Sequence, residues 1–252
     1  MTMHPFLAEF IGTSILLLLG AGVVANVSLK KTNAENQNPW ILITSAWGFA
    51  VFVAVFISTQ YSGAHLNPAV TIGLAVAKKF SWSLVPQYLI AQLLGAMFGS
   101  WLTYILYIDH FRETKDEDTV RGTFCTGPSI RNFKNNFFSE FIGTFVLVFG
   151  VFFIASPNIE IEGLVTENFG LGAVDALPVG ILVWVIGISL GGTTGYAINP
   201  ARDFGPRTIY QLIPRKNKNP DWSYSWIPVF GPITGGIVAG FFYLYIYPLL
   251  IA

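Results

Sequence analysis

Two copies of the tripeptide Asn-Pro-Ala stand in the most apolar parts of this 252-residue chain, at 67–69 and 199–201. Asn is a strong helix N-cap, and Pro is favoured at the first helical position, where its missing N–H is not needed. Each copy therefore predicts a helix start, which presents partial positive charge. The residues concerned are Asn67, Pro68 and Ala69 in the first copy and Asn199, Pro200 and Ala201 in the second.

A second repeat shows that the two copies are equivalent. The sequence Glu-Phe-Ile-Gly-Thr begins at Glu9 and again at Glu140, a spacing of 131 residues, and Asn67 and Asn199 are 132 residues apart. Two matches at nearly the same spacing predict a duplicated unit. A lone Asn-Pro pair is more often a simple turn, but two copies in a duplicated chain favour a functional site.

The repeated acids need a partner, because an isolated charge inside an apolar segment is costly. One reading makes Glu9 and Glu140 proton relays of a coupled transporter. Their symmetric placement favours a structural role instead, in which they accept N–H bonds from irregular loops ahead of each Asn-Pro-Ala helix.

The composition indicates a membrane protein. The chain is 53% apolar, 15% aromatic and 11% charged, whereas soluble proteins are about 25% charged. Its 14 basic and 14 acidic residues balance, so no nucleic-acid partner is expected. The single Cys125 excludes an internal disulfide and a cysteine-rich metal site.

Six apolar stretches are long enough to span a bilayer, which takes about 20 residues. They lie near 6–27, 40–60, 84–107, 137–157, 176–194 and 226–248. The apolar pieces at 67–77 and 199–212 reach only about half the hydrocarbon core, and we interpret them as half-helices. Non-helical backbone beside them is tolerated only where it is buried or lines a water-filled cavity.

The predicted fold is therefore all-α: six transmembrane helices and two re-entrant half-helices. Each unit has three crossings, so the second is inverted relative to the first, and the two half-helix starts meet near the bilayer midplane. One channel domain spans 1–252, with repeat one at about 1–107, a linking loop at about 108–136 and repeat two at about 137–252.

On these motifs the chain resembles the major intrinsic protein family, the aquaporins and glycerol facilitators, over all eight helical segments. The resemblance implies that Asn67 and Asn199 donate their side-chain amides to a passing molecule. It also implies a ladder of acceptor carbonyls along the pore, at Gly63, Ala64 and His65 in one half and at Gly195, Tyr196 and Ala197 in the other.

The same resemblance implies a four-residue selectivity filter. Trp47 lies 20 residues before the first Asn, Gly187 lies 12 before the second, and Tyr196 and Arg202 complete the set. Water-selective members have His at the Gly187 position. An aromatic corner beside guanidinium donors suits glycerol, which has an apolar edge and a hydroxyl edge.

Three further positions bear on whether the chain resembles the glycerol-conducting branch of the family. Asp203, directly after Arg202, resembles that branch, and it also suits the first helical turn and a pair with Arg207. Two positions depart from the branch pattern: Tyr196 stands where Phe is common, and Gly127 where an aromatic residue is usual.

The resulting hypothesis is a passive channel for glycerol, other small neutral polyols and water that excludes ions and protons. The chain has no Gly-rich phosphate loop, metal-spaced His pair or nucleophile elbow, so no enzyme, cofactor or metal is expected. The expected partners are glycerol and water as permeants, the lipid bilayer and three further copies in a homotetramer. The alternatives are a coupled secondary transporter and a non-conducting adhesion or structural protein.

The family implies a multi-pass protein of the cell (plasma) membrane with cytoplasmic termini. That orientation would leave only Lys78 and Lys79 of the basic residues on the cytoplasmic side. The positive-inside rule predicts the reverse. We follow the family, because long loops and a duplicated architecture weaken a charge count.

Overall fold

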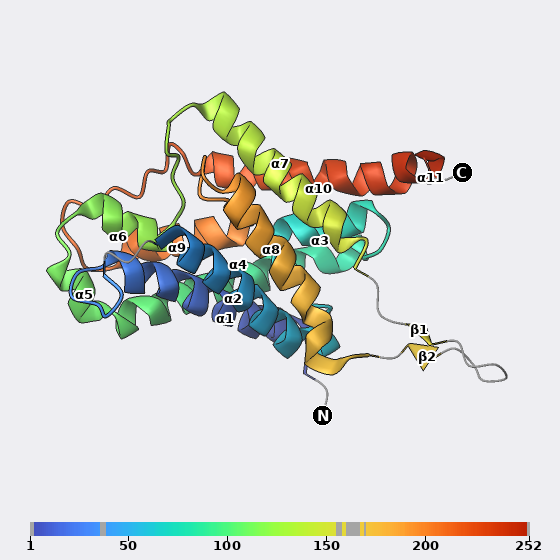
Figure 1. The fold of residues 1–252 in the computed structure, drawn as a ribbon, viewed down its shortest axis with the longest axis horizontal. Coiled ribbons are helices and arrows are strands. Elements are labelled where there is room, and N and C mark those ends of the chain that lie inside the picture. Colours follow the sequence, from blue (N-terminus) through green and yellow to red (C-terminus); the bar gives the residue numbers. More distant parts are fainter. Residues whose placement is uncertain (1–2, 36–38, 155–157, 160–166, 169, 251–252) are drawn as a thin grey trace.

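The computed structural model describes residues 3–35, 39–154, 158–159, 167–168 and 170–250. Six long helices and two half-helices form one bundle (Figure 1). The long helices are α1 (Pro5–Ser28), α2 (Pro39–Ser62), α4 (Val85–Leu106), α7 (Phe133–Val151), α8 (Leu177–Leu190) and α10 (Trp226–Phe241). The half-helices are α3 (Pro68–Val76) and α9 (Pro200–Leu212). The predicted fold class is confirmed.

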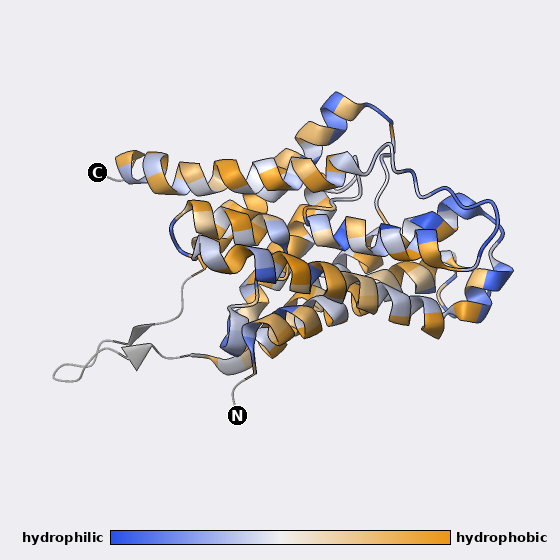
Figure 2. Ribbon diagram, turned by 180° about the vertical axis from the view of Figure 1, so that it is seen from behind, coloured by the Kyte–Doolittle hydropathy of each residue, from blue (hydrophilic) through white to orange (hydrophobic). Residues whose placement is uncertain are grey.

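Many large hydrophobic side chains are exposed along the helices. The hydrophilic residues gather mainly at the ends of the bundle (Figure 2). Among the described residues, five helices are long and apolar enough to cross a membrane. The remaining long helix, α7, spans 19 residues, but Lys134, Asn135 and Asn136 in its first turn and Glu140 lower its mean hydropathy. The chain is therefore a multi-pass membrane protein.

Two helix boundaries differ from the predicted ones. α7 begins at Phe133 rather than near 137, because the side chain of Asn132 caps it by accepting the N–H of Asn135 at 3.1 Å. It ends at Val151, and the predicted end near 157 lies outside the described residues. α8 ends at Leu190 rather than near 194, where Gly191 and Gly192 follow.

Short elements occupy the predicted loops. The linking loop contains α5 (Ile108–Glu113) and α6 (Glu117–Phe124), and Asp116 caps α6 by accepting the N–H of Thr119 at 3.0 Å. In the second loop, β1 (Asn158–Ile159) pairs antiparallel with β2 (Glu167–Asn168). At the end of the chain, α10 continues through a π-helical turn at Phe242–Ile246 into α11 (Tyr247–Leu250).

The two repeats share one packing scheme. α1 packs on α2 and α4, and α7 packs on α8 and α10. Each half-helix crosses to the other repeat, since α3 packs on α10 and α9 on α4. Glycines permit this approach: a Cβ on Gly236 would lie 2.5 Å from the Ala69 carbonyl oxygen. The half-helices thus enter from opposite ends of the bundle (Figure 1).

Candidate functional site

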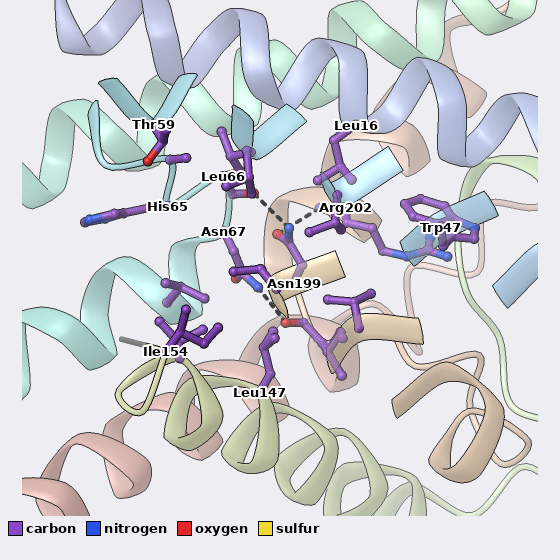
Figure 3. A pocket seen from close by; sticks show the side chains of 18 of the residues that line it. Leu16, Trp47, Thr59, His65, Leu66, Asn67, Leu147, Ile154, Asn199 and Arg202 are labelled. Atoms are coloured by element: carbon purple, nitrogen blue, oxygen red, sulfur yellow. Dashed lines mark hydrogen bonds between the residues drawn. The ribbon is translucent and has the colours of Figure 1, made fainter. Parts of the chain in front are cut away.

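A cavity of about 340 Å³ lies between the starts of the two half-helices. Figure 3 shows Trp47 and Arg202 toward one end of it, the two asparagines in the middle, and His65 and Ile154 toward the other end. Of the residues predicted for the site, those lining it are Trp47, Gly63, Ala64, His65, Asn67, Tyr196, Ala197, Asn199 and Arg202. Gly187 and Gly195 are not among the lining residues.

The two asparagines cap their own helices and bind each other's loops. Asn67 Oδ1 accepts the N–H of Ala69 at 2.8 Å, and Asn199 Oδ1 accepts the N–H of Ala201 at 3.0 Å. Asn67 Nδ2 donates to the Ile198 carbonyl at 2.8 Å. In the same way, Asn199 Nδ2 donates to the Leu66 carbonyl at 2.9 Å. An amide nitrogen carries two N–H groups. Each Asn therefore keeps one N–H beyond the bond that joins the halves.

The loops ahead of the half-helices adopt a left-handed backbone at matching positions. The φ angles are 77°, 52° and 52° at Gly63, Ala64 and Leu66, and 80°, 37° and 44° at Gly195, Tyr196 and Ile198. A left-handed residue other than glycine costs about 1–2 kcal/mol. Such a loop persists only where its surroundings hold it, and in both halves a buried acid lies beside it.

Glu9 accepts four hydrogen bonds, two of them from the first loop. Its carboxylate accepts the backbone N–H groups of His65 at 2.9 Å and Leu66 at 2.7 Å. It also accepts the Ser62 hydroxyl at 2.7 Å and the Gln92 amide at 2.8 Å. The carboxylate is fully buried, so these donors replace the water that it lost.

Glu140 binds the second loop in the same way. It accepts the backbone N–H groups of Ala197 at 3.0 Å and Ile198 at 2.8 Å, together with the Thr194 hydroxyl at 2.7 Å. Thr194 stands five residues before its Asn, as Ser62 does in the first half. Sequence reasoning missed both hydroxyl donors, although this shared spacing is the signal that reveals them.

The structure brings the four predicted filter residues together, three of them on the cavity wall. The guanidinium carbon of Arg202 lies 4.2 Å from the centroid of the Trp47 ring, and Tyr196 lines the same cavity. Gly187 lies behind Tyr196, because a Cβ there would be 2.8 Å from Tyr196 Cζ. The absent side chain of Gly187 thus makes room for the tyrosine ring instead of lining the cavity.

Apolar side chains at helical spacing form most of the rest of the wall, which also includes Thr59 and Asp175. Along α2 the lining residues recur every four positions, a spacing that puts them on one face of a helix: Trp47, Val51, Val55 and Thr59. α8 and α7 contribute Val179, Val183, Leu147 and Val151. Sequence reasoning missed these stripes, which blend into the general apolarity of the spans. The described residues contain no cluster of His, Cys, Asp or Glu that could hold a metal.

Asp203 does not line the cavity but anchors loops beside it. Its carboxylate contacts Arg207 Nε at 2.8 Å and accepts the backbone N–H of Thr126 at 2.8 Å, and both charged side chains are fully buried. Arg207 also donates to the carbonyls of Thr126, Pro220 and Asp221. This ion pair therefore ties two separate loops to the first turns of α9.

A second ion pair on these loops predicts a small pH effect. Burial acts to raise the pKa of Asp221, but hydrogen bonds from Arg131 and Ser223 outweigh it and hold the pKa below its usual value. A lowered carboxyl pKa stabilises the fold above the unfolded pKa of about 3.9 and loses that effect as the pH falls through the folded value.

We expect Arg131→Ala to lower the stability of purified protein at pH 7 by about 0.5–1 kcal/mol, because the arginine is half exposed and solvent screens the pair. The difference from wild type should shrink by pH 3. Thermal unfolding in detergent at both pH values checks this, and an equal difference at pH 7 and pH 3 would contradict it.

Comparison with known proteins covers nearly the whole chain. Residues 1–243 match the family described as Major intrinsic protein. The chain is 49% identical over 246 residues to a probable glycerol uptake facilitator protein of Thermotoga maritima, covering 97% of this chain and 100% of that protein. It is 49% identical over 231 residues to glycerol uptake facilitator protein 3 of Lactiplantibacillus plantarum, covering 91% of each. The solved aquaglyceroporin from Plasmodium falciparum superposes with a TM-score of 0.84 at 33% identity, covering 98% of this chain and 97% of that one.

Proposed function

The chain belongs to the major intrinsic protein family, and we propose that it is a passive transmembrane channel that carries glycerol down its gradient. The observation that carries this proposal is the mixed lining of the cavity, which combines apolar helix stripes with Asn67, Asn199 and Arg202. The relatives named as glycerol uptake facilitators and the aquaglyceroporin fold support the same function.

The wall of the cavity matches the two edges of glycerol. The carbon edge packs on Trp47 and Tyr196, and the hydroxyl edge accepts N–H bonds from Arg202 and from the free N–H of each Asn. Loop N–H groups are bound to the buried acids, which leaves the loop carbonyls to accept the hydroxyl protons of the solute. No step requires coupling to an ion.

Exclusion of ions and protons follows from the fixed positive charge. Two helix starts, each worth about half a charge, face the middle of the cavity, and the Arg202 guanidinium lies beside it. This positive potential opposes a cation, or a proton on a water chain, in the middle of the cavity, whereas a neutral solute is not opposed by it.

We expect Arg202→Ala to raise proton leak through reconstituted protein at least about threefold, because the fixed charge that opposes protons is removed. A pH-sensitive dye inside proteoliposomes measures the leak under an imposed potential. Arg131→Ala is the matched control, since it removes a guanidinium from a loop outside the cavity. Leak at the wild-type level would exclude this role for Arg202.

The function itself is tested by stopped-flow flux in proteoliposomes for glycerol, water and urea side by side. The channel predicts glycerol re-swelling faster than in empty vesicles, without sharp saturation. Dependence of glycerol uptake on a proton or sodium gradient would favour the coupled transporter. Re-swelling no faster than in empty vesicles would favour the non-conducting membrane protein.

The finer parts of the assignment are proposals from the family. We propose that other small polyols and water also pass, that four copies assemble with one pore each, and that the protein resides in the plasma membrane with cytoplasmic termini. Six crossings place both termini on one side. Crosslinking in the membrane tests the tetramer, and labelling of single cysteines introduced near each terminus tests the side.

A further inference from the structure

We propose that Gly20, in α1, sets the width of the constriction by giving the Trp47 indole the space that a side chain would fill, and so decides whether a polyol passes. This inference rests on the proposed glycerol channel and names a positioning residue for it. Gly20 belongs to none of the Asn-Pro-Ala motifs, loops or filter positions.

Gly20 stands on the face of α1 that looks into the cavity. Leu16, one turn earlier, lines the cavity, and residues four apart share a helix face. Gly20 itself is buried. A side chain at this position would therefore point toward the lumen, as the side chain of Leu16 does.

The indole of Trp47 occupies that space. A Cβ on Gly20 would lie 2.4 Å from Trp47 Cζ3 and 2.5 Å from both Cε3 and Cη2, whereas carbon atoms in contact are about 3.5–4.0 Å apart. Near-equal distances to three adjacent ring atoms mean that the ring lies face-on against the glycine. The ring of Trp47 thus packs directly against the backbone of α1.

The Trp47 indole contacts both α1 and the Arg202 side chain. Its Nε1 has no hydrogen-bond partner among the described residues. Its neighbour on the cavity side is the Arg202 guanidinium, 4.2 Å from the ring centroid. A methyl group on Gly20 would push the ring away from α1, toward the Arg202 side chain and the lumen that both residues line. Figure 3 shows Trp47 and Arg202 next to each other.

The second half of the molecule contains the same device. On α8, Val183 lines the cavity, and Gly187 follows one turn later. The Tyr196 ring fills the space left by Gly187, at 2.8 Å from a Cβ built there. In each half, then, a glycine follows a cavity-lining residue by one helical turn, and an aromatic ring occupies the space where the glycine's side chain would be.

Gly20→Ala is the direct test, and Gly22→Ala is its matched control. Gly22 lies on the same helix, and a Cβ there would meet no atom within 4 Å. For Gly20→Ala we expect glycerol permeability to fall about tenfold and water permeability to change less than about twofold, because a narrowed pore excludes the larger solute first. Gly22→Ala should match wild type in both fluxes. Fluxes are normalised to the amount of folded protein in each vesicle preparation.

Making Gly20→Ala in Trp47→Phe protein as well separates an effect of the contact with Trp47 from a general loss of folding or packing. Phe is shorter than Trp, so in Trp47→Phe protein the added methyl group has room. We expect Gly20→Ala to change glycerol flux less than about twofold in that background, as non-additive neighbours do. If Gly20→Ala alone yields no folded protein, recovery of folded protein in the Trp47→Phe background supports the contact, and its absence overturns it.

Three results would overturn the inference: an equal loss of glycerol and water flux, the same glycerol loss in both backgrounds, or no loss at all. Failure of the channel itself looks different, because wild-type protein would then conduct glycerol no faster than empty vesicles.

Discussion

Replacing Glu140 by Ala is expected to abolish glycerol conduction and to reduce the yield of folded protein sharply. The carboxylate accepts the N–H groups of Ala197 and Ile198 and the hydroxyl of Thr194, all buried. Each hydrogen bond to a charged group is worth about 1.5–3 kcal/mol, and unpaired donors keep their desolvation cost. The second loop, strained at Tyr196 and Ile198, would lose the group that holds it.

Two variants sharpen this prediction. Glu140→Gln retains one acceptor oxygen but faces an N–H donor with its own NH₂, so it should conduct at an intermediate level. Ser139→Ala, next to it in α7, removes only a hydrogen bond to the Asn135 carbonyl and should resemble wild type. Extraction yield and glycerol flux per folded protein are the measurements. Wild-type conduction by Glu140→Ala would refute a supporting role for the acid.

Replacing Gly187 by His is expected to lower glycerol permeability about tenfold to a hundredfold, with a much smaller effect on water. The Cβ alone would lie 2.8 Å from Tyr196 Cζ and 3.1 Å from Thr44 Cγ2. The imidazole must therefore displace the tyrosine ring or extend past it into the cavity. Either result narrows the lumen and replaces apolar surface with a hydrogen-bonding group.

Gly192→His is the control for this substitution, because a Cβ on Gly192 would meet nothing within 4 Å and the residue is exposed. It should leave both permeabilities unchanged. Paired glycerol and water measurements on the same vesicles check the ratio. Equal losses of glycerol and water in Gly187→His would mean that the glycine does not shape the constriction.

Much of the architecture was predictable because its causes are local. Twenty apolar residues span a bilayer wherever they occur, and an Asn-Pro pair starts a helix through its own side chain and ring. The spacing of Glu9 and Glu140 then revealed the duplication and, with three crossings per unit, the inversion. The short helix α6 was not predicted, because it lies in a polar loop and has no long apolar stripe. Its start is set by the Asp116 side chain, which caps it.

In the candidate site, too, some features were predictable from the sequence and others were not. Asn67 and Asn199 were identified as helix caps from sequence. Their bonds to each other's loops join residues 131 and 133 positions apart, a pairing that helix chemistry does not specify. Gly187 was expected to line the constriction, and the structure places the Tyr196 ring over it.

By itself, then, the sequence determined the spans, the half-helix starts, the inverted repeat and the acids available to hold the loops, since each depends on the composition or spacing of nearby residues. Only the tertiary structure decided which side of the cavity each aromatic ring occupies. Trp47 rests on Gly20 and Tyr196 on Gly187 because each glycine leaves the space that the ring fills when the helices pack. Close packing between helices is a property of shapes in three dimensions, and it sets the width of the opening through which a solute would pass.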